Sequence, residues 1–265
     1  MRALAHTRRG AGEPLVLLHG IGHRRQVWDP VLDALAEQHD VVAVDFPGFG
    51  ESVALPPGDT PTPQRLADVV VEFATGLGMQ RPHVAGISLG GFVALQLAAT
   101  GRARTVTGIS PAGLWGPAGA PAYSRAVLRL LRATGRRLAP RADAACRTAA
   151  GRAVLGGLNY ARPWRVPPAV LAEDIRRLGG APGWDDTRAA LEHGWLEGAA
   201  GLVGVPAQVA WGTRDLVLPR AKGLRRDLLP SSVRLVALPG CGHSPTYDDP
   251  ALVVRTLLQG TGACQ

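Results

Sequence analysis

Short, almost wholly apolar runs recur along this chain, and each stops at a turn rich in glycine or proline. The run at 13–19 leads into His19-Gly-Ile-Gly22, and the run at 40–46 leads into Pro47-Gly-Phe-Gly50. Strands that are apolar on both faces are typical of a parallel sheet covered by helices on both sides. Because stretches with helical spacing separate these runs, the sequence predicts an α/β fold with a mostly parallel central sheet. Further runs lie at 83–87, 103–110, 205–212 and 233–238, and residues 3–8 are expected to add an N-terminal strand.

This alternation stops between residues 112 and 204, where four helical patterns occur and no strand pattern does. A connection of about 90 residues is too long for a loop within a compact domain. We therefore predict that 112–204 form a helical cap, or lid, over the strand ends, while 1–111 and 205–265 form the core. Four of the six tryptophans of the chain lie in the predicted cap, and we take them as candidates for a substrate pocket: Trp115, Trp164, Trp184 and Trp195.

The formal net charge of +8 is concentrated in one segment of the predicted cap. Ten arginines and one acidic residue lie between 123 and 165, so the rest of the chain is close to neutral. Without a broad basic surface or a known recognition motif, we expect no nucleic-acid partner. Four of these arginines recur at helical intervals, which is typical of a solvated helix face: Arg125, Arg129, Arg132 and Arg136. The alternative is a docking surface for an acidic carrier protein, an anionic substrate tail or a membrane surface.

The sequence shows no sign of membrane insertion or of a disulfide framework. No run approaches the roughly 18 apolar residues of a membrane span, and residues 1–9 lack the apolar run of a secretion signal. The three cysteines, Cys146, Cys241 and Cys264, are far apart and odd in number, so they indicate neither disulfides nor a metal site. We expect a cytoplasmic protein with no integral membrane segment.

The segment Gly86-Ile-Ser-Leu-Gly90 matches G-x-S-x-G, the pattern of a nucleophile elbow. In such an elbow a serine sits on a strained turn between a strand and a helix, and its neighbours must be small. The apolar run at 83–87 precedes Ser88 and a helix-like run at 91–99 follows it, which is the setting that the pattern requires. In a chain with 34 glycines, the alternative is an ordinary turn between a strand and a helix.

A serine hydroxyl needs a histidine to take its proton, and that histidine needs a carboxylate to hold its tautomer. His243 lies in a glycine-rich loop after the last predicted strand, where the functional groups of parallel sheets gather. Asp215 follows the strand at 205–212, so we predict a triad of Ser88, His243 and Asp215. The weaker candidates are His193, on a helical run of the cap, and Asp248, which resembles a helix N-cap.

Attack by Ser88 would create an oxyanion that backbone amides must stabilise. The amide after the nucleophile belongs to Leu89, and the second is expected from the loop after an earlier strand. We assign it to Ile21, in His19-Gly-Ile-Gly22. For His19 we expect a structural hydrogen-bonding role. His6, His23, His39 and His83 are expected to be surface or packing residues.

Together these segments resemble the ordered motifs of the α/β-hydrolase superfamily, over about 14–258 apart from the cap. The resemblance implies an eight-stranded, mostly parallel sheet with a helical cap after strand 6; the short N-terminal segment leaves open that the usual first strand is absent. It also implies acyl transfer through a serine-linked intermediate, with no metal and no organic cofactor. Dehalogenase and epoxide-hydrolase members carry aspartate at the elbow, so Ser88 disfavours both. The motifs are Leu-Leu-His19-Gly20, Asp45-Phe-Pro-Gly-Phe-Gly-Glu-Ser52, Gly86-Ile-Ser-Leu-Gly90, Trp211-Gly-Thr-Arg-Asp215 and Gly242-His243.

On this basis we expect a serine hydrolase that cleaves a carboxylic ester, or a related acyl bond, of a small to medium and largely apolar substrate. One alternative is a C–C bond hydrolase, or a non-hydrolytic lyase or cyclase, of the same superfamily. Another is a thioesterase or lactonase that docks an acidic carrier through the arginine-rich cap. A non-catalytic receptor would not need to keep the acid and the base.

Overall fold

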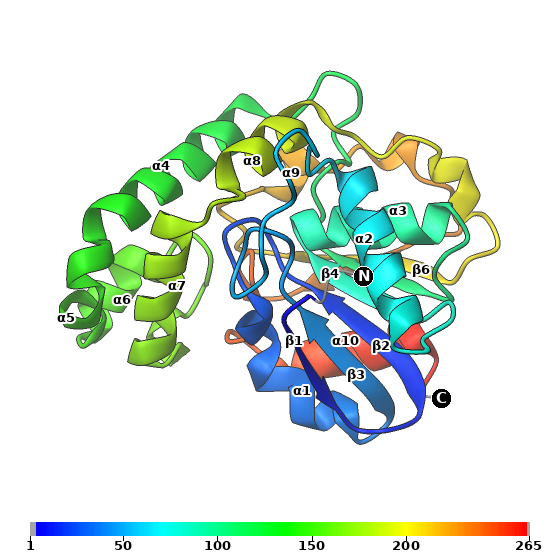
Figure 1. Cartoon of the computed structure of the whole chain (residues 1–265), viewed down its shortest axis with the longest axis horizontal. Helices are drawn as coiled ribbons and strands as arrows, with labels where there is room; N and C mark the ends of the chain where they lie inside the picture. The colour runs from blue at the N-terminus through cyan, green and yellow to red at the C-terminus, as the bar shows by residue number, and fades with distance from the viewer. Residues whose placement is uncertain (1–3, 264–265) are drawn as a thin grey trace.

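The computed structural model describes residues 4–263, and its centre is a seven-stranded sheet in the order β1-β3-β2-β4-β5-β6-β7. β1 pairs antiparallel with β3, and the other neighbours pair in parallel. The predicted mostly parallel sheet is therefore confirmed (Figure 1). The strands are β1 (His6–Arg9), β2 (Glu13–Leu18), β3 (His39–Val44), β4 (His83–Ile87), β5 (Val106–Ile109), β6 (Ala207–Gly212) and β7 (Arg234–Leu238).

The described residues hold seven strands, not the eight that the family resemblance implied. The long helical segment consequently follows the fifth strand of this sheet, and the prediction of a cap after strand 6 is corrected to this position. The predicted N-terminal strand is present as β1, although Ala3 lies outside the described residues.

Helices cover both faces of the sheet, and the side chains of each strand alternate between them. In β2, Val16 and Leu18 pack with α2 and α3, whereas Leu15 and Leu17 pack with α1 and α10. Each strand is thus buried on both sides, as its apolar sequence predicts. The helices that belong to the core are α1 (Asp29–Ala36), α2 (Pro63–Gly76), α3 (Leu89–Ala99), the short α9 (Arg220–Gly223) and α10 (Pro250–Thr261).

Residues 112–204 are here called the helical insertion, and its helices α4 to α7 project to one side of the sheet (Figure 1). The part formed by α5 and α7 has a small core of its own, which includes Cys146, Tyr160 and Leu171. Residues 142–155 form two helices, because the Thr148 hydroxyl accepts from the Gly151 amide at 3.0 Å and begins a new helix. The insertion contains α4 (Ala122–Leu138), α5 (Ala142–Cys146), α6 (Ala149–Gly156), α7 (Pro168–Gly180) and α8 (Trp184–His193).

Within residues 4–263, no helix has the length and apolar character needed to cross a membrane. Cys146 and Cys241 are buried free thiols, and Cys264 lies outside the described residues. The cytoplasmic location stays a prediction.

The turn from β4 into α3 brings backbone against backbone. A Cβ atom added at Gly86 would overlap the carbonyl group of Gly90 and lie 2.7 Å from the amide nitrogen of Gly91. One added at Gly90 would overlap the carbonyl oxygen of Leu18 in β2. Glycine is therefore required at both positions, because a side chain there would keep the backbone segments apart and change the conformation of the turn.

We expect Gly86→Ala to lower the free energy of unfolding by about 1–3 kcal/mol, because the methyl group must displace backbone. Gly180→Ala is the matched control: Gly180 is exposed at the end of α7, and a Cβ added there meets nothing within 4 Å. It should change stability by less than about 1 kcal/mol, in the stabilising direction. Urea denaturation measures both, and equal effects of the two substitutions would contradict the close approach at the elbow.

Candidate active site

Ser88 occupies the turn between β4 and α3 in a strained conformation, with φ 57° and ψ −115°. Positive φ is uncommon for a residue other than glycine, and it persists only where the surroundings fix it. Here the Ser88 amide donates to the Ile109 carbonyl at 2.9 Å, and the Ser88 carbonyl accepts from Ala112 at 3.0 Å. The amide of Leu89, the first residue of α3, has no acceptor within the helix and is available to a ligand.

His243 and Asp215 are joined by a hydrogen bond of 2.8 Å between Nδ1 and Oδ2, and both side chains are buried. Asp215 follows β6, and its other oxygen accepts from the amides of Val217 at 3.0 Å and Leu218 at 2.8 Å. Because a carboxylate only accepts hydrogen bonds, Nδ1 carries the proton and Nε2 is the basic nitrogen of the ring. The pair can therefore withdraw a proton from a neighbouring hydroxyl.

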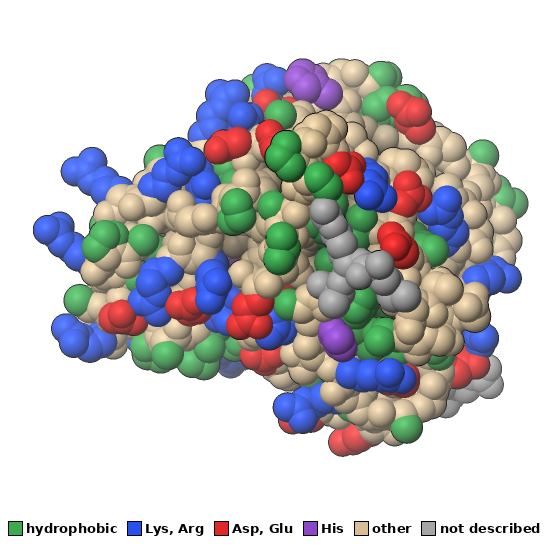
Figure 2. Space-filling model, viewed as in Figure 1, with side chains coloured by type: hydrophobic (Ala, Val, Ile, Leu, Met, Phe, Trp, Pro, Cys, Tyr) green, Lys and Arg blue, Asp and Glu red, His purple; other side chains and the backbone are tan. Residues whose placement is uncertain are grey.

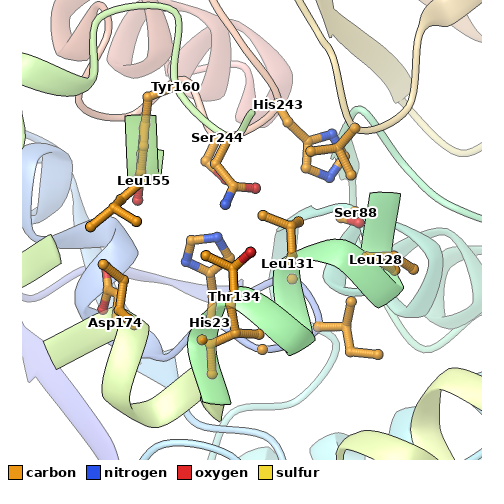
Figure 3. Close-up of a pocket in the computed structure, with 18 of the residues that line it drawn as sticks. His23, Ser88, Leu128, Leu131, Thr134, Leu155, Tyr160, Asp174, His243 and Ser244 are labelled. Atoms are coloured by element: carbon orange, nitrogen blue, oxygen red, sulfur yellow. The ribbon is translucent and has the colours of Figure 1, made fainter. Parts of the chain in front are cut away.

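Ser88 and His243 line the same cavity, which encloses about 730 Å³ of empty space including its open mouth. Figure 3 shows the two side chains next to each other at one side of this cavity, near Leu128. They also line a smaller cavity of about 360 Å³. The predicted nucleophile and base thus lie where the two cavities meet.

The loop after β2 packs directly against the elbow. A Cβ atom added at Gly20 would lie 3.2 Å from Cβ of Ser88, and Ile21 lines the larger cavity. The position of this loop is fixed by the buried carboxylate of Asp45, which accepts from the Arg25 amide at 2.6 Å and pairs with the Arg25 guanidinium at 2.5 Å. The loop that contains Ile21 and the elbow residue Leu89 thus both adjoin Ser88, and the oxyanion role of their amides stays a prediction.

His19 is fully buried and forms two hydrogen bonds within the core, one from Nδ1 to the Gly20 carbonyl at 2.7 Å and one from the Phe46 amide to Nε2 at 2.9 Å. Burial lowers its pKa, so the ring is neutral. This arrangement matches the structural role expected for His19. His193, the weaker candidate for the base, is exposed at the end of α8.

Asp248, the weaker candidate for the acid, has another role. Its carboxylate is buried and accepts backbone amides from Gly242 at 2.8 Å, Ala161 at 3.0 Å and Arg162 at 2.6 Å. The helix N-cap is its neighbour Asp249, which accepts from the Leu252 amide at 3.0 Å. Asp248 therefore ties the loop of His243 to the helical insertion.

The structure brings two of the four candidate tryptophans to the cavities. Trp184 lines the larger cavity and Trp115 the smaller one. The prediction is wrong for Trp164, which is 53% exposed, and for Trp195, which packs against the main core. Both lie in connections between helices, and the periodicity of the sequence does not determine where such side chains point.

The four arginines predicted to share one helix face have different surroundings. Arg132 is buried, donates to the carbonyls of Leu178 and Ala181, and lies over the ring of Trp184 at 5.5 Å. Arg129 and Arg136 are exposed and pair with Glu192 and Asp185, and Arg125 is half-buried beside the smaller cavity. Figure 2 shows acidic side chains between the basic ones on the visible face of the insertion. The stripe is therefore not one continuous basic docking face.

The larger cavity also has polar residues that the sequence did not identify. His23, expected to be a surface or packing residue, lines it together with Asn159, Tyr160 and Asp174. His23 could have been found from its position, because it lies two residues after Ile21 in the loop beside Ser88. The other three belong to the insertion and carry no recognisable motif.

Comparison with known proteins supports the fold. Residues 15–256 match the Alpha/beta hydrolase family. The chain is 32% identical over 216 residues to the epoxide hydrolase EphH of Mycobacterium tuberculosis, covering 75% of this chain and 94% of that protein. It is 39% identical over 111 residues to the dihydrolipoyllysine-residue acetyltransferase component of the acetoin cleaving system of Cupriavidus necator, covering 41% of this chain and only 29% of that protein.

Among solved structures, the enol-lactonase from Burkholderia xenovorans LB400 superposes with a TM-score of 0.76 and 24% identity, covering 98% of this chain and 96% of that chain. At this identity the likeness shows the fold alone.

We expect Asp215→Asn to slow modification of Ser88 by a fluorophosphonate reagent by about 10³–10⁴-fold, because the amide cannot hold the basic tautomer of His243. Asp248→Asn makes the same change at another buried carboxylate near His243. It should mainly lower the free energy of unfolding, by about 1–3 kcal/mol, because the NH2 group of asparagine then faces backbone N–H donors. The rate of labelling, followed by mass spectrometry of the peptide that contains Ser88, separates the two. An unchanged rate in Asp215→Asn would contradict the role given to Asp215.

Proposed function

Because the chain belongs to the alpha/beta hydrolase family, we propose that it is a serine hydrolase that cleaves a carboxylic ester, or a related acyl bond, of a small to medium and largely apolar substrate. The observation that carries this proposal is the buried Asp215–His243 pair, which opens on the same cavity as the strained Ser88. This is the arrangement that activates a serine hydroxyl for attack on a carbonyl.

In the proposed reaction, Ser88 Oγ attacks the carbonyl carbon while His243 Nε2 takes the hydroxyl proton. The amides of Ile21 and Leu89 stabilise the resulting oxyanion, and Asp215 stabilises the imidazolium. The tetrahedral intermediate expels the alcohol, which receives the proton from His243, and leaves an acyl group on Ser88. Water then attacks this ester with His243 again as the base, so the acid is released and Ser88 regains its proton.

The shape of the site supports a substrate with two arms. Ser88 and His243 border both cavities, so the acyl and alcohol parts of an ester can each enter a different cavity from the reacting carbon. Aliphatic side chains dominate the walls of the larger cavity: Leu128, Leu131, Leu155, Leu171, Ile175, Leu178 and Val217.

The identity of the nucleophile favours acyl transfer over epoxide opening, although one relative is named as an epoxide hydrolase. Attack of a carboxylate on an epoxide gives an ester, which water can hydrolyse. Attack of Ser88 on an epoxide would give an ether, which an oxyanion site and a histidine base cannot cleave. Attack on an acyl carbon gives an ester of Ser88, which the same residues can hydrolyse.

We do not extend the proposal to an acidic carrier protein. Arg132 is buried within the insertion, and Arg129 and Arg136 pair with acidic residues of α8. Three of the four arginines of the predicted stripe are thus buried or paired, which weakens the field that such docking would use.

A panel of p-nitrophenyl esters, from acetate to long acyl chains, tests the proposed activity. We expect the wild type to prefer short and medium chains and Ser88→Ala to reduce kcat/KM by at least about a thousandfold, because no other group supplies the nucleophile. An epoxide such as styrene oxide should not be opened. Labelling by a fluorophosphonate should place the adduct on Ser88.

Two outcomes would contradict the proposal in different ways. Hydrolysis retained by Ser88→Ala would remove Ser88 from the mechanism. A wild type that is labelled at Ser88 but cleaves no ester would keep Ser88 as the nucleophile and would favour C–C bond cleavage, or lyase or cyclase chemistry, over ester hydrolysis.

A further inference from the structure

One end of the larger cavity is polar, and the proposed reaction does not use it. Figure 3 shows Tyr160 and Asp174 at the side away from Ser88, with His23 and Ser244 between. Asn159 completes this group of cavity-lining residues. His23 comes from the loop after β2, Asp174 from α7, and Ser244 from the loop of His243, so the group is assembled from three distant parts of the chain.

Three polar atoms of this group are buried and make no hydrogen bond within residues 4–263. They are the hydroxyl oxygen of Tyr160, Nδ1 of His23 and Oγ of Ser244. Tyr160 is 2% exposed and Ser244 is fully buried. Buried polar groups are nearly always partnered, since leaving one unpaired costs stability. Three unpaired groups on the wall of one cavity indicate that the cavity receives a polar ligand.

The charges of this region specify a neutral ligand. Burial lowers the pKa of His23 to about 3, so its ring is uncharged at neutral pH. Burial raises the pKa of Tyr160, so its hydroxyl keeps its proton and can donate. Asp174 is paired with Arg24 at 2.8 Å, so this ion pair adds no net charge to the wall. An additional charged group would enter without a counter-ion.

The three groups also suit one kind of atom. A tyrosine or serine hydroxyl can donate or accept, and a neutral imidazole nitrogen does one or the other. A ligand oxygen with lone pairs, such as that of a hydroxyl or a ketone, can pair with them. A hydrocarbon chain cannot, and it fits the aliphatic side chains nearer to Ser88, such as Leu128 and Leu131 (Figure 3).

We infer that Tyr160, His23 and Ser244 form a subsite for a neutral oxygen-bearing group, a hydroxyl or a ketone, that the substrate carries at a distance from the carbonyl attacked by Ser88. This inference rests on the proposed function, because the substrate is taken to occupy the cavity beside Ser88. Ester hydrolysis alone does not require the subsite, so the two can fail separately.

Matched esters test the subsite. Each p-nitrophenyl alkanoate from butyrate to octanoate is compared with counterparts whose acyl chain ends in a hydroxyl, a ketone or a carboxylate. A parallel series of esters carries these groups on the alcohol part. For at least one chain length in one series, we expect the hydroxyl or ketone to raise kcat/KM at least tenfold over the plain chain and the carboxylate to lower it. The absence of a preference at every length in both series would overturn the subsite.

Tyr160→Phe removes one hydroxyl and keeps the ring. It should reduce about tenfold the ratio of kcat/KM for the oxygenated ester to kcat/KM for the plain ester. Because this hydroxyl has no partner within residues 4–263, Tm should stay at or above the wild-type value, whereas a structural role for the hydroxyl would lower it. Tyr247→Phe is the matched control: its ring packs on Tyr160 at 5.9 Å, it is not among the cavity-lining residues, and the preference should persist.

A binding measurement keeps the subsite testable even if no ester is cleaved. Calorimetry on Ser88→Ala compares methyl ketones of the same chain lengths with and without a terminal hydroxyl. We expect the hydroxylated ketone to bind at least tenfold tighter, and Tyr160→Phe in the same background to remove the difference. Equal affinities would overturn the subsite even where ester hydrolysis by Ser88 is established.

Discussion

The close contact of backbones at the β4–α3 turn is the constraint on which the remaining site depends. Gly86 and Gly90 leave no room for a Cβ atom, so α3 starts directly against β4 and the end of β2. This proximity holds Ser88 at positive φ and exposes the free amide of Leu89. It also brings the loop after β2, which contains Ile21, beside Ser88. The proposed nucleophile and the proposed oxyanion donors therefore depend on one packing arrangement.

Buried carboxylates position the loops around this turn. Asp45 holds the loop of Arg25, Asp215 orients His243 while bonding two amides of its own loop, and Asp248 bonds the amide of Gly242. Backbone amides in the loops at the strand ends have no neighbouring strand to bond, so a buried carboxylate serves as their acceptor. A carboxylate suits this task because one side chain can accept several amides at once.

The sequence could predict the sheet, the elbow and the Asp215–His243 pair near Ser88, because those signals are local. Apolar runs mark strands buried on both faces, and the strand order places Asp215 and His243 at the carboxyl edge beside Ser88. The insertion could not be predicted at the same depth. Helical spacing groups residues on α4 but does not determine which face packs, so Arg132 is buried although it resembles its solvated neighbours. Asp174 meets Arg24 across 150 positions of sequence, and no local pattern reports such a contact.

The shared anchor at Asp248 has a consequence for how such a protein can be recombined. One carboxylate bonds the amide next to His243 and the amides of Ala161 and Arg162, and the Ser244 amide donates to the carbonyl of Asn159 at 2.9 Å. The helical insertion and the loop of His243 are thereby joined through main-chain groups. A chimera that grafts 112–204 from a relative keeps this joint only where the incoming backbone offers two free amides to the same acid.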